Sequence, residues 1–163
     1  MQNHKIKVAV IGATGYTGAE LIRVLAFHSG VELTQLISRS KAGQSVSELM
    51  PELSNRLNLD FSDTINPGAD VWFLALPHGA SKSFIEEHKA LADQVKIIDL
   101  SNEFRSINHS KWGGYHFTFG LPELRRQEIQ NANHIANPGC FATAITLGLA
   151  PLFHHHKIDE QTS

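Results

Sequence analysis

Apolar residues recur along the chain with two alternating periods. Residues 6–11 (Ile-Lys-Val-Ala-Val-Ile) are β-branched and nearly all apolar, which is typical of a strand covered on both faces. From 15 to 29 the period becomes helical, and a His-Ser-Gly sequence supplies a stop signal. The apolar stripe of this helix consists of Leu21, Ile22, Leu25 and Ala26. Residues 31–37 resemble a second strand, so the opening of the chain predicts a βαβ unit.

The same alternation continues through most of the remaining chain. The pattern weakens over 41–67, where we expect at most one short helix and an irregular stretch, and 101–126 is predicted to be a long loop. Further strands are expected over 70–76, 95–100 and 134–136, and further helices over 80–91 and from 140 to about 152. The sequence therefore predicts an α/β fold, a doubly wound, Rossmann-type, mostly parallel sheet with helices on both faces.

Composition narrows the class of protein. Of 163 residues, 42% are hydrophobic and 18% charged, with a formal net charge of −2, which is the profile of a soluble globular domain. There is no basic excess of the kind that nucleic-acid binding requires, and no apolar run approaches the roughly 20 residues needed to cross a bilayer. The N-terminus lacks the pattern of a secretion signal. We therefore expect a cytoplasmic protein that binds neither nucleic acid nor membrane.

A glycine-rich turn stands between the first strand and the first helix. In Gly12-Ala-Thr-Gly-Tyr-Thr-Gly18, Gly12 permits a tight turn, Gly15 allows a pyrophosphate to approach the backbone, and Gly18 lets helix and strand pack closely. The N–H groups at the start of the following helix would hold the anion. The turn therefore predicts a dinucleotide site.

The end of the second strand refines the cofactor. An NAD site usually places Asp or Glu there, whereas this chain has Ser38-Arg39-Ser40. A guanidinium and hydroxyls can bind the 2′-phosphate of NADP, which a carboxylate would repel. NADP is therefore predicted; the alternative is that Arg39 is an ordinary solvated loop cation.

The single cysteine, Cys140, cannot form an internal disulfide, and it follows Asn137-Pro-Gly at the start of an apolar helix. The helix dipole stabilises a thiolate in that position, which favours a nucleophile over a small buried residue. A thiolate beside a nicotinamide predicts attack on an activated acyl carbon, a thioester, and reduction of that thioester to an aldehyde.

At this point the sequence resembles the N-acetyl-γ-glutamyl-phosphate reductases of arginine biosynthesis, which are related to aspartate-semialdehyde dehydrogenases. The likeness spans nearly all of the chain and is carried by five blocks in order. These are Gly12-Ala-Thr-Gly-Tyr-Thr-Gly18, Ala75-Leu-Pro-His-Gly79, Asp99-Leu-Ser-Asn-Glu-Phe-Arg105, Gly120-Leu-Pro-Glu123 and Ala136-Asn-Pro-Gly-Cys-Phe-Ala-Thr143.

The resemblance implies a role for each matching residue. Cys140 would be the acylated nucleophile, while Ser101, Arg105 and Asn137 would contact the substrate, Arg105 as a bidentate partner of phosphate or carboxylate. The alternative for Ser101 and Arg105 is ordinary loop contacts, and Glu123 is expected to support its loop. The NADP contacts would come from Gly12, Thr14, Gly15, Tyr16, Thr17, Gly18, Ser38, Arg39, Leu76, Pro77 and His78. No metal site is expected.

The chain is shorter than the members of the family that it resembles. Members of that family are about twice as long, and their second domain contributes a histidine base and much of the substrate pocket. We expect residues 1–150 to form the NADP-binding domain and 151–163 to begin the second domain, so this chain alone would bind nucleotide without turnover. Residues His154 to His156 are expected to suit the negative end of the last helix rather than replace the base or bind metal. The full-length enzyme is expected to be a homo-oligomer.

Three alternatives stay open at this stage. One is the same chemistry on an aminoadipyl phosphate, which is longer by one methylene that the sequence cannot distinguish. Another is a short-chain dehydrogenase, although the Tyr and Lys spaced four apart that it needs are missing, since Phe119 follows Tyr115 at that spacing. The third is a non-catalytic NADP-sensing module in which Cys140 is inert.

Overall fold

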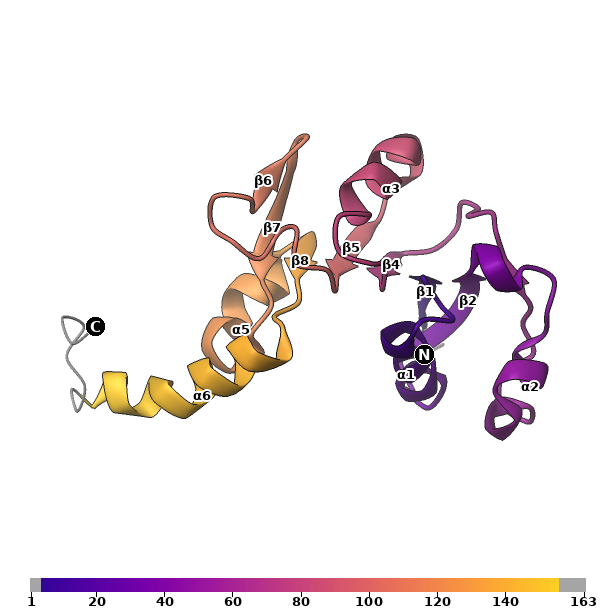
Figure 1. Cartoon of the computed structure of the whole chain (residues 1–163), viewed down its shortest axis with the longest axis horizontal. Helices are drawn as coiled ribbons and strands as arrows, with labels where there is room; N and C mark the ends of the chain where they lie inside the picture. The colour runs from indigo at the N-terminus through magenta and orange to yellow at the C-terminus, as the bar shows by residue number, and fades with distance from the viewer. Residues whose placement is uncertain (1–3, 156–163) are drawn as a thin grey trace.

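The computed structural model describes residues 4–155, which form an eight-stranded sheet in the order β3-β2-β1-β4-β5-β8-β7-β6 (Figure 1). Neighbouring strands are parallel except β6 and β7. The strands are β1 (Ile6–Ile11), β2 (Val31–Ile37), β3 (Phe61–Ser62), β4 (Val71–Leu74), β5 (Lys96–Asp99), β6 (Lys111–Trp112), β7 (Tyr115–Phe119) and β8 (His134–Ala136). The predicted α/β, Rossmann-type, mostly parallel sheet is confirmed.

Helices cover both faces of this sheet (Figure 1). They are α1 (Tyr16–Ala26), α2 (Val46–Leu49), α3 (Ser81–Glu87), α4 (Lys89–Ala92), α5 (Pro122–Asn131) and α6 (Cys140–His154), with 3-10 turns at Arg39–Lys41 and Pro51–Leu53. In the part of the chain that the structure describes, no helix is long and apolar enough to cross a membrane.

The core is divided into two clusters because successive side chains of a strand point to opposite faces. In β1, Val8 and Val10 pack in one cluster with Ile22 of α1. Ala9 and Ile11 pack in the other, which also contains Ile85 of α3. Burial on both faces explains why the central strands are almost continuously apolar.

The opening βαβ unit agrees with the sequence prediction, and β1 and β2 have the predicted bounds. The helix predicted over 80–91 is instead divided into α3 and α4 at His88, where the backbone leaves the helical region (φ −113°, ψ 28°). The weak stretch over 41–67 contains the expected short helix, α2, and in addition the edge strand β3.

The prediction of a long loop over 101–126 is wrong. This stretch contains β6, β7 and the first half of α5, and β7 lies beside β8 inside the sheet. Tyr115 and Phe117 are buried and alternate with the exposed His116, which is the pattern of a strand. The glycines that flank β7, together with the largely polar character of α5, hide this pattern in the sequence.

The topology brings distant loops to one edge of the sheet. Strand β1 is paired with β2 on one side and with β4 on the other, both in parallel, so the chain reverses its winding direction at β1. In open α/β sheets, ligands bind at such a switch point, outside the carboxyl ends of the strands. The loops after β1, β2, β4, β5 and β8 all start at this edge.

Candidate active site

The glycine turn after β1 is held tightly against its neighbours. Gly12 has φ +81°, and a Cβ built on it would lie 2.3 Å from the carbonyl oxygen of Ala75 in the adjoining loop. The N–H groups of Gly12 and Ala13 both donate to Ile37 O at 3.0 Å, which ties the turn to the end of β2. Only glycine can occupy position 12 in this geometry.

The outer side of the same turn is open. Ala19 N donates to Gly15 O at 2.8 Å as the first bond of α1, which leaves the N–H groups of residues 16–18 for an external anion. A Cβ built on Gly15 would find no atom closer than 3.4 Å, and Tyr16 is 98% exposed. The turn therefore has the room and the free N–H donors that a pyrophosphate group needs, and binding by the stretch from Gly12 to Gly18 remains a prediction.

The residues predicted to bind the 2′-phosphate differ in exposure. Ser38 is buried, and its Oγ lies 2.6 Å from Oγ1 of Thr14, so the two hydroxyls connect the turn to the end of β2. The Arg39 side chain is 77% exposed and makes a 3.4 Å contact with Glu87 Oε2. Arg39 is therefore the residue of this group that can reach a bound phosphate, with Ser38 shaping the loop beneath it.

The loop after β4 carries the residues predicted to lie against the nicotinamide. Leu76 is half-buried, while Pro77 and His78 are exposed at the edge of the sheet. The Nδ1 atom of His78 accepts a 3.2 Å hydrogen bond from Asn102 N, so this loop is joined to the one after β5.

Ser101 is fully buried. Its Oγ donates to Asp99 Oδ2 at 2.7 Å and accepts from Glu103 N at 3.1 Å. Burial raises the pKa of the Asp99 carboxyl, against the opposing effect of its hydrogen bonds from Ser81 and Ser101. The Ser101 hydroxyl is thus occupied inside the protein, and a substrate contact by this residue remains a prediction.

Arg105 joins the loop after β5 to the loop that precedes Cys140. Its Nε donates to Asn137 O at 2.8 Å and its Nη2 donates to Leu100 O at 2.7 Å. The remaining nitrogen, Nη1, lies 2.8 Å from the position of a Cβ built on Gly139. A substrate contact by Arg105 would therefore come from Nη1 or require the guanidinium to release a carbonyl. The substrate roles of Arg105 and Asn137 remain predictions.

Cys140 is the first residue of α6, and its thiol is exposed. Gly139 precedes it in an extended conformation, and the Gly139 carbonyl accepts hydrogen bonds from both N and Oγ1 of Thr143, at 2.9 and 3.0 Å. The thiol therefore stands at the positive end of a helix, on the edge that also carries the glycine turn. Such a thiol can attack an electrophilic carbon.

The last helix supplies no further candidate ligand. His154 and His155 are exposed at its end with ring centroids 5.4 Å apart, and His156 lies outside the described residues. Over residues 4–155 no group of three or more His, Cys, Asp or Glu side chains could hold a metal ion. Glu123 lies exposed in the first turn of α5.

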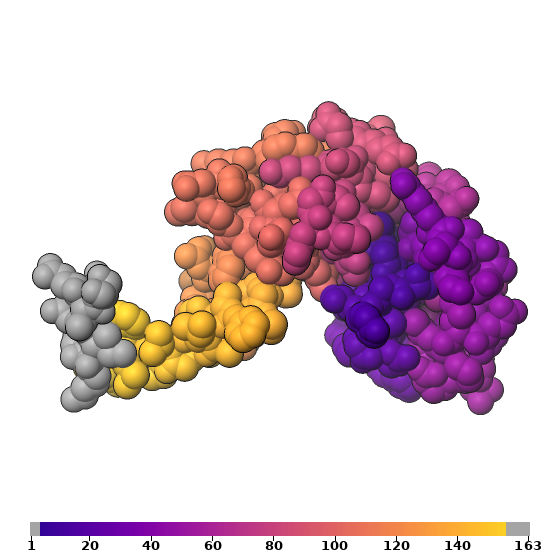
Figure 2. Space-filling view, viewed as in Figure 1, coloured from indigo at the N-terminus to yellow at the C-terminus, as the bar shows by residue number. Residues whose placement is uncertain are grey.

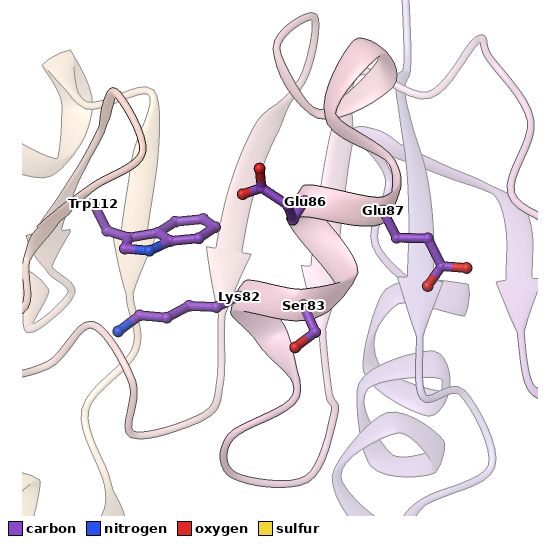
Figure 3. Close-up of a pocket in the computed structure, with 5 residues that line it drawn as sticks. All are labelled: Lys82, Ser83, Glu86, Glu87 and Trp112. Carbon is purple, nitrogen blue, oxygen red and sulfur yellow. The ribbon is translucent and has the colours of Figure 1, made fainter.

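A shallow groove of about 460 Å³ lies between α3 and β6 (Figure 3). The residues that line it are not among the predicted site residues. Figure 3 shows the Lys82 side chain running alongside the Trp112 ring, while Glu87 points to the other side of α3.

Asp99 and Glu103, which both form hydrogen bonds with Ser101, were not singled out from the sequence. Their signal was a carboxylate at the end of a buried strand, followed by a second one four residues later.

Sequence comparisons match this chain to a family of known proteins. Residues 7–132 match the family model described as semialdehyde dehydrogenase, NAD binding domain. An N-acetyl-gamma-glutamyl-phosphate reductase of Flavobacterium johnsoniae is 44% identical over 154 residues, which are 94% of this chain and 47% of that protein. A putative [LysW]-L-2-aminoadipate/[LysW]-L-glutamate phosphate reductase of Pyrococcus furiosus is 49% identical over 156 residues, covering 90% of this chain and 46% of that one.

The fold also matches solved structures. Aspartate semialdehyde dehydrogenase II of Vibrio cholerae superposes with a TM-score of 0.71 at 21% identity, covering 93% of this chain and 47% of that one. The Candida albicans enzyme, solved with NADP, gives 0.67 at 18% identity, with 93% and 47% covered. The chain thus spans about half the length of the relatives it matches. By its matched domain, its topology and its glycine turn, the chain belongs to the semialdehyde dehydrogenase family and carries that family's NAD-binding domain.

Proposed function

We propose that the chain is the cofactor-binding, nucleophile-bearing part of an NADPH-dependent reductase. The enzyme converts N-acetylglutamyl phosphate into N-acetylglutamate semialdehyde and phosphate. One observation carries the proposal: the glycine turn and Cys140 lie at the same edge of one parallel sheet, with β4 and β5 between their strands. A bound dinucleotide can extend from the turn across these two strands towards the thiol.

The chemistry assigned to Cys140 follows from its position. The thiolate attacks the acyl carbon, the bond to the phosphate oxygen breaks, and phosphate leaves with the electron pair, which gives a thioester. When bound, NADPH supplies the hydride that reduces this acyl group. Release of the aldehyde breaks the carbon–sulfur bond and returns the thiolate. The open start of α6 stabilises negative charge on the sulfur both before attack and after release.

The cofactor residues are assigned by position on this edge. Backbone N–H groups of residues 16–18 and the exposed side of Gly15 hold the pyrophosphate, and Arg39 binds the 2′-phosphate. The nicotinamide faces the loop after β4, which contains Leu76, Pro77 and His78.

A second candidate substrate is an aminoadipyl phosphate. The Pyrococcus relative named for aminoadipate and glutamate phosphates is as similar to this chain as the reductases named for N-acetylglutamyl phosphate. The same thioester chemistry would operate on either compound, because the reacting group is an acyl phosphate in both and the carbon chain that carries it is longer by one methylene in the aminoadipyl compound.

The rest of the site is proposed to come from a second domain that starts within 151–163 and supplies the base. Helix α6 supports this proposal because none of its described residues is buried, although it is strongly apolar. Figure 2 shows this helix, in yellow, extending away from the body of the molecule. Along it and α5 runs an apolar groove of about 960 Å³, to which Leu124, Ile145 and Leu149 contribute. A cytoplasmic location and a homo-oligomeric full-length enzyme belong to the same proposal.

Intact-mass spectrometry after brief exposure to N-acetylglutamyl phosphate tests the proposal. An acyl adduct is expected on the wild-type chain and not on Cys140→Ser. Parallel exposure to aminoadipyl phosphate separates the two substrates by the rate of adduct formation. A wild-type chain that stays unmodified, with a thiol that iodoacetamide alkylates as slowly as a buried one, would contradict the assignment of Cys140.

A further inference from the structure

The loop after β5 contacts both sides of the candidate active site. Towards α3 it forms a closed ring of hydrogen bonds through Asp99, Ser101, Glu103 and Ser81. Towards α6 it holds the loop before Cys140. Seven consecutive residues, 99–105, therefore lie between the loop assigned to the nicotinamide and the nucleophile.

Each member of the ring contributes to two of its bonds. Ser81 Oγ donates to Asp99 Oδ1 at 2.5 Å, and Ser101 Oγ donates to Asp99 Oδ2 at 2.7 Å. Glu103 N donates to Ser101 Oγ at 3.1 Å, and Ser81 N donates to Glu103 Oε1 at 2.7 Å, which closes the ring. Asp99, Ser81 and Ser101 are completely buried, so water does not compete for the two bonds to the Asp99 carboxylate, whereas the two bonds of Glu103 are partly buried.

Glu103 is the member that binds backbone rather than side chains of α3. Its carboxylate accepts from Ser81 N at 2.7 Å and from Lys82 N at 3.4 Å, which are N–H groups that the start of a helix leaves unpaired. Six residues, 75–80, separate the end of β4 from α3, so fixing the first residues of α3 fixes one end of that loop. A second bond, from Asn102 N to His78 Nδ1, fixes its middle.

The 99–105 segment also holds the loop that precedes Cys140. Arg105 donates to Asn137 O and Leu100 O, and Asn137 N donates to Asp99 O at 2.8 Å. The segment thus sets the separation between residues 76–78 and Cys140. Hydride transfer depends on that separation, because reacting atoms must approach to about 3–3.5 Å.

We propose that Glu103 is a positioning residue, which acts through the start of α3 to place residues 76–78, and with them the nicotinamide, relative to Cys140. The inference rests on the proposed function, since it assumes that this loop faces the nicotinamide. Glu103 itself touches neither cofactor nor substrate.

The binding of two ligands distinguishes a positioning role of Glu103 from a general effect on the stability of the fold. NADPH reaches from the glycine turn to residues 76–78, whereas adenosine 2′,5′-bisphosphate lacks the nicotinamide half and contacts only the turn and Arg39. Glu103→Ala is expected to weaken NADPH about tenfold, as for the loss of a charge-assisted hydrogen bond, and to leave the bisphosphate Kd unchanged. Fluorescence of bound NADPH, which reports on the surroundings of the nicotinamide, is expected to shift towards that of the free coenzyme.

Two further variants complete the experiment. Glu103→Gln retains an oxygen for the 2.7 Å bond from Ser81 N and is expected to restore most of the NADPH affinity. Glu86→Ala removes an exposed carboxylate from the same helix and is expected to change neither Kd. Equal loss of both ligands in Glu103→Ala, or loss of neither, would overturn the positioning role and leave the proposed function standing. Failure of the wild-type chain to bind either ligand would overturn both.

Discussion

A Cβ atom built on Gly18 would lie 2.3 Å from the carbonyl oxygen of Gly12, and 3.0 Å from backbone atoms of Ala13. The first turn of α1 is therefore in direct contact with the end of β1, with no space for a side chain between them. The same carbonyl oxygen accepts a 3.1 Å hydrogen bond from Gly15 N. The shape of the pyrophosphate turn thus depends on close backbone packing at its inner side.

Gly18→Ala is expected to destabilise the chain, because backbone atoms must move to accept the methyl group, at a cost of about 1–3 kcal/mol. Gly15→Ala is the matched control. Its backbone (φ −70°, ψ 162°) suits any residue and its nearest neighbour is 3.4 Å away, so Tm should hardly change while NADPH affinity falls. Thermal unfolding and NADPH titration of both variants check this, and equal Tm values would contradict the steric argument.

The sequence could predict what depends on local pattern. The bounds of β1 follow from a nearly continuous apolar run and those of β2 from a segment that is apolar at both ends, and the glycine turn and Cys140 are each recognisable within a few residues. Strand β7 could not be predicted in this way, because its place beside β8 depends on a crossover through the polar helix α5. The hydrogen bond from Arg105 to Asn137 O likewise could not be predicted, since the two residues are 32 positions apart along the chain. Folding, and not sequence spacing, brings them together.

Arg39→Ala is expected to weaken NADPH binding about 10- to 100-fold and to leave NADH binding nearly unaffected, because the proposed function assigns the guanidinium to the 2′-phosphate, which NADH lacks. Glu87→Ala, which removes the 3.4 Å acidic partner of Arg39, should not weaken NADPH. Kd values for both coenzymes at one salt concentration measure the difference. A similar loss for NADPH and NADH would assign Arg39 a general role in the fold of its loop.

Ile145→Ala on α6 is expected to change the free energy of unfolding of the 163-residue chain by less than about 0.5 kcal/mol, since this side chain is 59% exposed. Ile85→Ala, at a fully buried position of α3, should cost about 2–5 kcal/mol. Urea unfolding of the two variants compares the same substitution at an open and a covered site. If Ile145→Ala were as destabilising as Ile85→Ala, then α6 would be packed against another surface in solution.

His134 should make stability depend on pH. The ring lies between Tyr115 and Phe117, with centroids 5.1 and 5.4 Å away, and within residues 4–155 its buried Nδ1 has no hydrogen-bond partner. Burial lowers the pKa of His134; nearby Lys96 lowers it further, while Asp93 opposes the shift. Below the ordinary value of 6.5, the unfolded chain therefore binds a proton that the folded chain still excludes. The stability that the neutral His134 ring contributes is therefore present above that pH and is lost as the pH falls.

His134→Phe is expected to reduce the fall in the urea midpoint between about pH 7.5 and 5.5, because phenylalanine keeps the aromatic contacts and cannot take up a proton. His109→Asn, which removes an exposed histidine, should leave the pH dependence as in the wild type. The comparison uses the slope with pH, so a constant difference in stability between the variants does not affect it. An unchanged slope in His134→Phe would show that the proton uptake occurs at another group.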